Sequence, residues 1–203
     1  MTRRTFLAGA LAAGLLALAG CNDSSQAAPG QLALQGSDIT GTHLGRDLDM
    51  IDPDGKQRRL ADYRGKVVIV FFGYTHCPDV CPTAMAQLAQ TMELLGPDAS
   101  RTQVLMITVD PGRDTPEILG RYARAFNPAF VGLTGSEAQL AATARSFRAH
   151  YAKSPGKTPD DYAMDHSSAF YVLDQNGEAR SLLRGDATAA DIAHDIRQIL
   201  QKG

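Results

Sequence analysis

The stretch VVIVFFGYTHCPDVCP, residues 67–82, determines both the fold class and the chemistry expected of this chain. Residues 67–72 are an unbroken run of β-branched and aromatic side chains, which is typical of a strand buried on both faces. Cys77 and Cys81 follow this strand directly. Because ligands of open α/β sheets collect beyond the carboxyl ends of the strands, we expect a functional site at these two cysteines.

The spacing of Cys77 and Cys81 predicts that both sulfurs lie on one face of a helical turn. Pro78 and Pro82 suit the first turn of a helix, where a missing N–H group costs little. Thiols at a helix N-terminus are expected to have lowered pKa values, and two soft thiolates are ligands that Cu(I) prefers. The spacing alone leaves open metal binding, redox chemistry and a structural disulfide, which would close a loop too small to stabilise much.

Working outward from this stretch, the sequence predicts alternating strands and helices. The turn signal Asp-Pro-Asp-Gly at 52–55 predicts a hairpin before the main strand. Apolar residues at helical spacing predict a helix after the cysteines, and a second buried strand is expected at 104–109. Pro116 follows Thr115 at the start of another predicted helix, which extends to Phe126.

The remaining sequence predicts a short strand, a helix, a loop, a hairpin and a last helix. Ser136 and Gln139 form a capping-box pattern, and we expect the helix that they open to continue through Tyr151. The expected boundaries are a strand at 130–133, a loop at 154–161, a hairpin at 169–183 with its turn at 174–177, and a helix through 192–200. This order predicts an α/β fold, a thioredoxin-like sandwich with an additional N-terminal hairpin.

Residues 1–20 have the pattern of a signal peptide. Two arginines precede an apolar run at 6–19, which is too short for a comfortable membrane span. The ending Leu-Ala-Gly-Cys resembles a bacterial lipobox, in which Cys21 would become the lipidated N-terminus. The alternatives are an ordinary secretory signal with a chance cysteine or a short membrane anchor. The paired arginines also resemble a twin-arginine export signal, and the choice between that route and the Sec route stays open.

The boundaries that follow are a tether at 21–37, beginning with the lipidated Cys21, and a thioredoxin-like domain at 38–203. The tether is rich in small and polar residues, which favours flexibility. Either export route places the domain outside the cytoplasm, and we expect lipid attachment to the cytoplasmic membrane. The net charge is −2 and no run of basic residues occurs, so the chain lacks the electrostatic signature of nucleic-acid binding.

Three motifs resemble those of the Sco/SenC family, thioredoxin-fold copper proteins that help to assemble cytochrome c oxidase. They lie at 71–83, at 109–116 (VDPGRDTP) and at 162–174 (YAMDHSSAFYVLD). The similarity extends from about Leu44 to the C-terminus. What the resemblance implies is that Cys77, Cys81 and His166 bind one copper ion per chain.

The residues around His166 support this interpretation independently. The histidine precedes a predicted strand, where thioredoxin-like oxidoreductases usually carry a cis-proline opposite their cysteines, and Asp165-His166-Ser167-Ser168 contains no proline. Asp165 is a candidate to orient His166, since ligating histidines usually have hydrogen-bonded partners. Asp110 and Asp114 resemble acids near the family's site, although Asp114 equally suits a residue leading into a helix cap.

The family resemblance implies a copper metallochaperone, not an enzyme, that delivers copper to the CuA centre of cytochrome c oxidase subunit II. A lipid anchor would confine it to the membrane that holds this target. One alternative is a thiol–disulfide reductase that keeps the CuA-site cysteines reduced through Cys77 and Cys81. Another is a signalling protein that senses copper or redox state. The sequence does not indicate which protein supplies the copper.

Overall fold

Strands β4 (Val67–Gly73) and β5 (Thr102–Thr108) form the parallel centre of a six-stranded sheet in the computed structural model, which describes residues 32–158 and 161–202. Every residue of both strands is buried, as the apolar run predicts for β4. The strand order is β1-β10-β9-β4-β5-β6, with β6 parallel to β5 and β9 antiparallel to β4. The outer strands are β1 (Ser37–Asp38), β6 (Val131–Leu133), β9 (Ala169–Leu173) and β10 (Ala179–Arg184).

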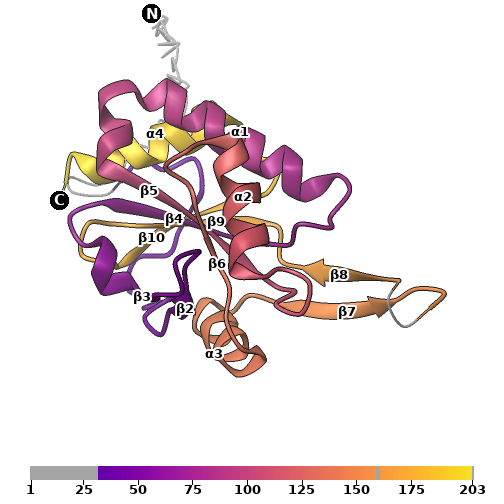
Figure 1. Ribbon diagram of the computed structural model, residues 1–203. Helices are drawn as coiled ribbons and strands as arrows, with labels where there is room; N and C mark the ends of the chain where they lie inside the picture. The colour runs from indigo at the N-terminus through magenta and orange to yellow at the C-terminus, as the bar shows by residue number, and fades with distance from the viewer. Residues whose placement is uncertain (1–31, 159–160, 203) are drawn as a thin grey trace, which may run out of the picture.

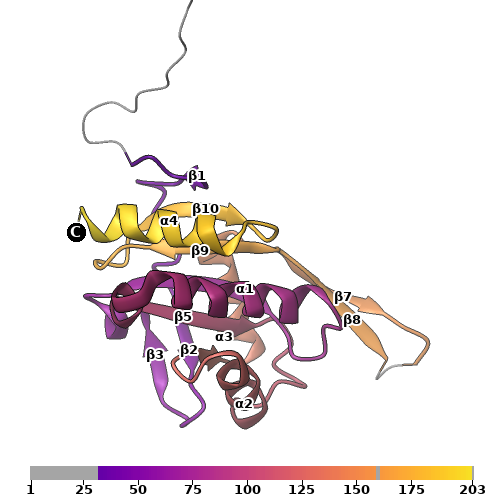
Figure 2. The same cartoon turned by 90° about the horizontal axis from the view of Figure 1, so that it is seen from above.

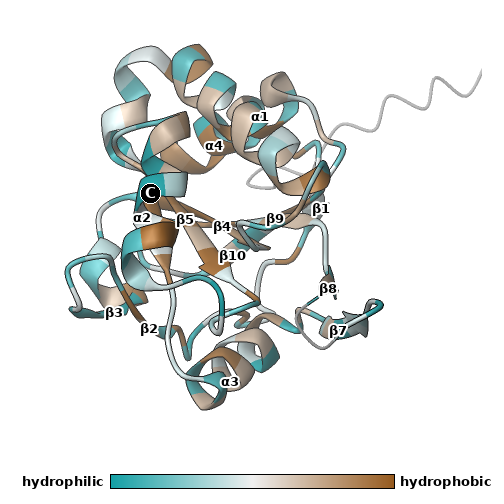
Figure 3. Ribbon diagram, turned by 45° about the vertical axis from the view of Figure 1, so that its right-hand side comes forward, coloured by the Kyte–Doolittle hydropathy of each residue, from teal (hydrophilic) through white to brown (hydrophobic). Residues whose placement is uncertain are grey.

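Helices cover both faces of this sheet. Figures 1 and 3 show α1 (Val80–Leu95) and α4 (Ala189–Leu200) side by side on one face, and α3 (Glu137–Phe147) on the opposite face. Helix α2 (Pro116–Phe126) packs beside the edge strand β6. The expected α/β sandwich is therefore confirmed. Two short 3₁₀ helices, η1 (Leu60–Tyr63) and η2 (Gly96–Arg101), precede β4 and β5.

The predicted N-terminal hairpin and helix caps are also present. Strands β2 (Asp49–Ile51) and β3 (Gln57–Arg59) pair on either side of the turn at 52–55. Thr115 caps α2 by accepting a hydrogen bond from the backbone of Ile118 at 3.3 Å. Ser136 and Gln139 form the expected capping box of α3.

The end of α3 and the segment after it differ from the sequence prediction. The helix ends at Phe147, because Arg148 adopts a left-handed conformation with φ of 53°. Tyr151 therefore lies in a strand, β7 (Tyr151–Pro155), whose last two residues fall within the predicted loop at 154–161. This strand pairs with β8 (Tyr162–His166), and neither strand was predicted. This hairpin is a separate two-stranded sheet that projects from the body of the protein (Figures 1 and 2).

A buried carboxylate fixes the start of the described chain against α4. Asp195 is fully buried and accepts hydrogen bonds from the backbone N–H groups of Gln35 at 2.7 Å and Gly36 at 3.1 Å, and from the hydroxyl of Ser181 at 2.6 Å. The carbonyl of Ala33 lies 2.7 Å from Nε2 of His194. Within the described residues, the chain is therefore already bonded to α4 at Ala33, Gln35 and Gly36, which belong to the segment predicted as a tether. The predicted signal peptide and Cys21 lie outside the described residues.

Candidate metal centre

The two cysteines occupy the turn between the end of β4 and the start of α1. Cys77 precedes the helix, which begins at Val80, and Cys81 is its second residue. The prediction that one helical turn carries both cysteines is therefore wrong, because Asp79 has non-helical backbone angles. The sulfurs still converge, since the N–H group of Cys81 donates to Sγ of Cys77 at 3.4 Å.

His166, the last residue of β8, completes the group. Its Nε2 lies 3.5 Å from Sγ of Cys81, and one ligand atom from each of Cys77, Cys81 and His166 lies within 4.8 Å of the other two. Nδ1 faces the carbonyl of Ser167 at 3.2 Å. Because a carbonyl only accepts hydrogen bonds, the proton of the neutral ring belongs on Nδ1, which leaves the lone pair of Nε2 directed towards the sulfurs.

Two aromatic rings fix the imidazole of His166 between them. Phe71 and Tyr74 approach it edge-on, with ring centroids 6.1 Å and 5.9 Å away. Both aromatic side chains are almost fully buried. Burial lowers the pKa of His166, against smaller opposing effects of the Ser167 carbonyl and the charge of Asp165. A neutral imidazole at neutral pH is the protonation state that binds a metal.

The cysteines differ in exposure and acidity. Cys81 is fully buried, and this burial raises the pKa of its thiol well above the usual range. Cys77 is partly exposed. Burial would raise its pKa too, but hydrogen bonds from backbone N–H groups, including those of Asp79 and Val80, lower the pKa of Cys77 overall. The prediction of two acidic thiols is thus confirmed for Cys77 and wrong for Cys81, because desolvation there outweighs the helix N-terminus.

Gly73 gives the sulfur of Cys81 the space that it occupies. A Cβ atom at this position would lie 3.1 Å from that sulfur and 2.7 Å from the ring of Phe71. Both distances are shorter than ordinary van der Waals contact, so the end of β4 accommodates only glycine without displacing a neighbour.

Asp114 holds the loop before Cys77 in place. Its fully buried carboxylate accepts hydrogen bonds from the backbone N–H group of Thr75 at 3.1 Å, from the Thr75 hydroxyl at 2.5 Å and from the Thr108 hydroxyl at 2.6 Å. The sequence suggested a residue leading into the cap of α2, and the cap itself is the neighbouring Thr115. A polar residue beside a helix cap gave no signal that it also bonds to a segment 39 positions away.

The other two acids predicted near the site do not contact its three ligand atoms. Asp110 is buried, but its carboxylate bonds to Arg113 and to the hydroxyl of Tyr162. Asp165 is exposed, and neighbouring residues of a strand point to opposite faces. Within the described residues, it is the carbonyl of Ser167, rather than Asp165, that faces the free nitrogen of His166.

The donor set restricts the metals that this group suits. Two thiol sulfurs and one imidazole nitrogen fit copper or zinc, whereas magnesium and calcium prefer oxygen ligands. Three ligands leave a coordination position open to an incoming group. Of the two cysteines, the partly exposed Cys77 is the one that an incoming group can reach.

Comparison with known proteins identifies the family. The family model described as SCO1/SenC matches residues 37–201, which include all three motifs and the Cys–Cys–His group. The chain belongs to the SCO1/SenC family. The SCO1/SenC match also covers Asp114 and the β7–β8 hairpin.

Individual SCO1/SenC relatives agree with this assignment. The mitochondrial SCO2 homolog of Bos taurus is 39% identical over 154 residues, which are 75% of this chain and 58% of that protein. The chain thus spans less than two thirds of that relative's length. The structure of Bradyrhizobium japonicum ScoI with copper bound is 36% identical, with a TM-score of 0.69 over 75% of this chain and 96% of that one.

A third likeness supports the fold alone. The structure of BsSco, described as a member of the Sco family of cytochrome c oxidase assembly proteins, is 21% identical. Its TM-score is 0.63, over 83% of this chain and 98% of that one. Within residues 32–158 and 161–202, no helix has the length and apolar character needed to cross a membrane.

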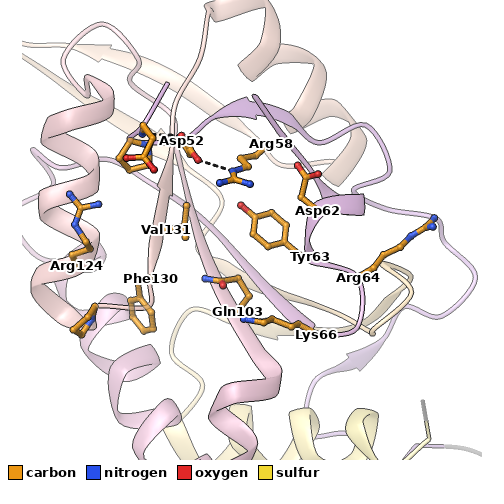
Figure 4. A pocket seen from close by; sticks show the side chains of 13 residues that line it. Asp52, Arg58, Asp62, Tyr63, Arg64, Lys66, Gln103, Arg124, Phe130 and Val131 are labelled. Atoms are coloured by element: carbon orange, nitrogen blue, oxygen red, sulfur yellow. Dashed lines mark hydrogen bonds and ion pairs between the residues drawn. The ribbon is translucent and has the colours of Figure 1, made fainter. Parts of the chain in front are cut away.

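A separate hollow of about 380 Å³ is lined by none of the candidate metal ligands. Its lining comes from the β2–β3 hairpin, η1 and the beginnings of β5 and β6 (Figure 4). Arg58 bonds to Asp52 at its rim at 2.7 Å, and the buried hydroxyl of Tyr63 has no hydrogen-bond partner among the described residues.

Proposed function

We propose that this protein binds one copper ion through Cys77, Cys81 and His166 and delivers it to the CuA centre of cytochrome c oxidase subunit II. The observation that carries the proposal is the convergence of two sulfurs and one imidazole nitrogen within 4.8 Å. Membership of the SCO1/SenC family and the copper-bound ScoI relative support copper over zinc.

Ligand exchange is the mechanism of transfer that the geometry supports. A thiolate of the target would first occupy the open coordination position, and it would then displace one protein ligand at a time. Cys77 is the ligand best placed to leave, because it is partly exposed, whereas Cys81 is enclosed by the protein. No electron or proton from a further reactant is needed if the copper keeps its oxidation state.

The proposed location is the outer side of the cytoplasmic membrane. Support comes from residues 1–21, where a signal-like apolar run ends in the lipobox-like Leu-Ala-Gly-Cys. A lipid on Cys21 would hold the copper-binding domain near a membrane-bound oxidase and raise its effective concentration there.

A thiol–disulfide reductase is the second candidate function, and the contrast between the cysteines favours it. The more acidic and exposed Cys77 would attack a target disulfide, and Cys81 would resolve the mixed disulfide. The target disulfide takes up two electrons and two protons and becomes a dithiol. The chain is left with a Cys77–Cys81 disulfide, which an external dithiol must reduce. Each turnover therefore depends on a separate source of reductant.

Copper titration of the reduced protein tests the leading proposal. We expect one copper ion per chain, with a sulfur-to-Cu(II) charge-transfer absorption that disappears in Cys77→Ala, Cys81→Ala and His166→Ala. His150→Ala is the matched control, because His150 is an exposed histidine next to the same hairpin and outside the group. Binding that is indifferent to His166→Ala would contradict the proposed site.

Disulfide exchange separates the two functions. His166→Ala removes a metal ligand but neither thiol, so a reductase would keep most of its rate towards a disulfide-bonded CuA-domain peptide. If oxidase assembly in cells survives His166→Ala and fails in Cys77→Ala, thiol reduction rather than copper delivery is the function.

A further inference from the structure

The strand that carries His166 is not part of the central sheet. Among the residues that the structure describes, β8 pairs with β7 alone, and the hairpin extends beyond the body of the protein (Figures 1 and 2). A two-stranded hairpin is at best marginally stable in water on its own. Contacts between the hairpin and the body therefore contribute to where His166 lies.

One such contact is made by Tyr162, the first residue of β8. Its hydroxyl donates to the buried carboxylate of Asp110 at 2.9 Å. Its backbone carbonyl accepts a hydrogen bond from Nη1 of Arg113 at 3.1 Å, and the guanidinium of Arg113 lies over its ring at 3.7 Å. Nζ of Lys153 lies 3.5 Å from the centroid of the same ring.

Asp110 and Arg113 are themselves held together. Nε of Arg113 bonds to the second carboxylate oxygen of Asp110, and both side chains are largely buried. Tyr162 and Asp110 are 52 residues apart in sequence, so this contact joins the hairpin to a distant part of the chain. The aromatic ring, its hydroxyl and its carbonyl are all engaged, which leaves the first residue of β8 little freedom.

The loop at 110–114 also contacts the segment that precedes the cysteines. Asp114, at the end of this loop, bonds to Thr75 two residues before Cys77. A single loop thus holds the histidine strand through Tyr162 and the cysteine loop through Thr75. Tyr162, Met164 and His166 lie on one face of β8, because side chains alternate along a strand.

We propose that Tyr162, held by Asp110 and Arg113, is a positioning residue that sets the place of His166 relative to the sulfurs of Cys77 and Cys81. This inference rests on the proposed copper site. Tyr162 touches none of the three ligand atoms and acts through the strand that it fixes. When this contact is weakened, His166 samples positions farther from the sulfurs, and copper loses its third ligand for part of the time.

Tyr162→Phe is the decisive variant, because it keeps the ring between Arg113 and Lys153 and removes only the bond to Asp110. The matched control is Tyr151→Phe, which removes a hydroxyl from the paired strand directly across from His166. Since a hydrogen bond to a charged acceptor is lost only in Tyr162→Phe, we expect copper affinity to fall about three- to tenfold there and to stay unchanged in the control.

A second measurement is made on the copper-free, reduced full chain. The NMR chemical shifts of the imidazole nitrogens and ring protons of His166 report the position of the ring between Phe71 and Tyr74. We expect these signals to shift and broaden in Tyr162→Phe, and the thermal midpoint to fall by no more than a few degrees. Arg113→Lys, which keeps the charge beside Asp110 but lacks the planar guanidinium, is expected to have a similar effect.

The two measurements separate this inference from the proposed function. If the wild-type chain binds no copper, the proposed function fails, and the NMR of the copper-free chain still tests the positioning. Unchanged His166 signals in Tyr162→Phe, or equal changes in Tyr151→Phe, would overturn the inference. A lower copper affinity that follows only the loss of thermal stability would overturn it as well.

Discussion

Replacement of Asp114 by asparagine is expected to destabilise the loop that carries Cys77 without altering any candidate ligand. The carboxylate is fully buried and accepts three hydrogen bonds, two from Thr75 and one from the hydroxyl of Thr108. Asparagine has the same shape, but one oxygen becomes an NH₂ group, which cannot accept. The oxygen that accepts only from the Thr75 hydroxyl can become this NH₂ group, so that hydroxyl must accept a hydrogen bond where it now donates one.

A hydrogen bond to a charged acceptor contributes about 1.5–3 kcal/mol. The loss of the charged acceptor for all three bonds, together with the reversal of one of them, predicts that Asp114→Asn lowers the free energy of unfolding by about 2 kcal/mol. Asp114→Ala removes all three bonds and leaves buried donors unpaired, so we expect about 4 kcal/mol, less than three full increments because coupled contributions do not add. Both values are large beside a typical total of about 5–15 kcal/mol.

Urea unfolding of the reduced, metal-free protein, followed by circular dichroism, measures this loss. Asp79→Asn is the matched control, because Asp79 is an exposed acid at the start of α1 whose side chain makes no capping hydrogen bond. We expect the control to stay within about 0.5 kcal/mol of the wild type. An Asp114→Asn variant as stable as this control would refute the role assigned to the buried carboxylate.

Three further variants or conditions test the environment of the ligands. Gly73→Ala should lower the free energy of unfolding by about 1–3 kcal/mol, because the added methyl group overlaps Phe71 and the sulfur of Cys81. Thermal unfolding measures this loss, and an unchanged thermal midpoint would contradict the close packing. Because burial lowers the folded-state pKa of His166, its contribution to stability is present above about pH 6.5 and is lost as the pH falls below that value. Urea unfolding midpoints measured from about pH 5 to about pH 7 should therefore depend less on pH in His166→Asn than in the wild type. Identical pH profiles of the two proteins would argue against a buried imidazole. Iodoacetamide should modify Cys77 well before Cys81, which peptide mass spectrometry detects, and equal rates would mean that Cys81 is not enclosed.

The sequence predicted the parts of the fold that depend on local patterns. The apolar run at 67–72 and the capping pair Ser136 and Gln139 each specify an element through neighbouring residues alone, and both elements are present. The β7–β8 hairpin was missed, because its residues 151–155 (YAKSP) lack both a β-branched run and a regular polar alternation. Its residue Tyr162 bonds to Arg113, which lies 49 positions away in the sequence, so local patterns do not reveal this contact.

The candidate site shows the same division. Cys77, Cys81 and His166 were predicted from their motifs, and the structure brings their ligand atoms together. Their unequal exposure was not predicted, because the burial of Cys81 depends on how β4 and α1 pack against it. The contact between Asp114 and Thr75 was not predicted either, since it joins two loops that only the folded sheet brings side by side.

The clasp that Asp195 forms around residues 35 and 36 has a consequence for distances from the bilayer. If Cys21 carries the lipid, only about 12 residues separate it from Ala33, and even a fully extended chain of that length spans about 40 Å. The clasp therefore caps the height at which the copper-carrying domain can stand above the lipid headgroups. Without the clasp and the contact between His194 and Ala33, the four residues from 33 to 36 would add about 13 Å to that height. If the domain delivers copper as proposed, the receiving centre would have to lie where a domain attached at this height can reach it.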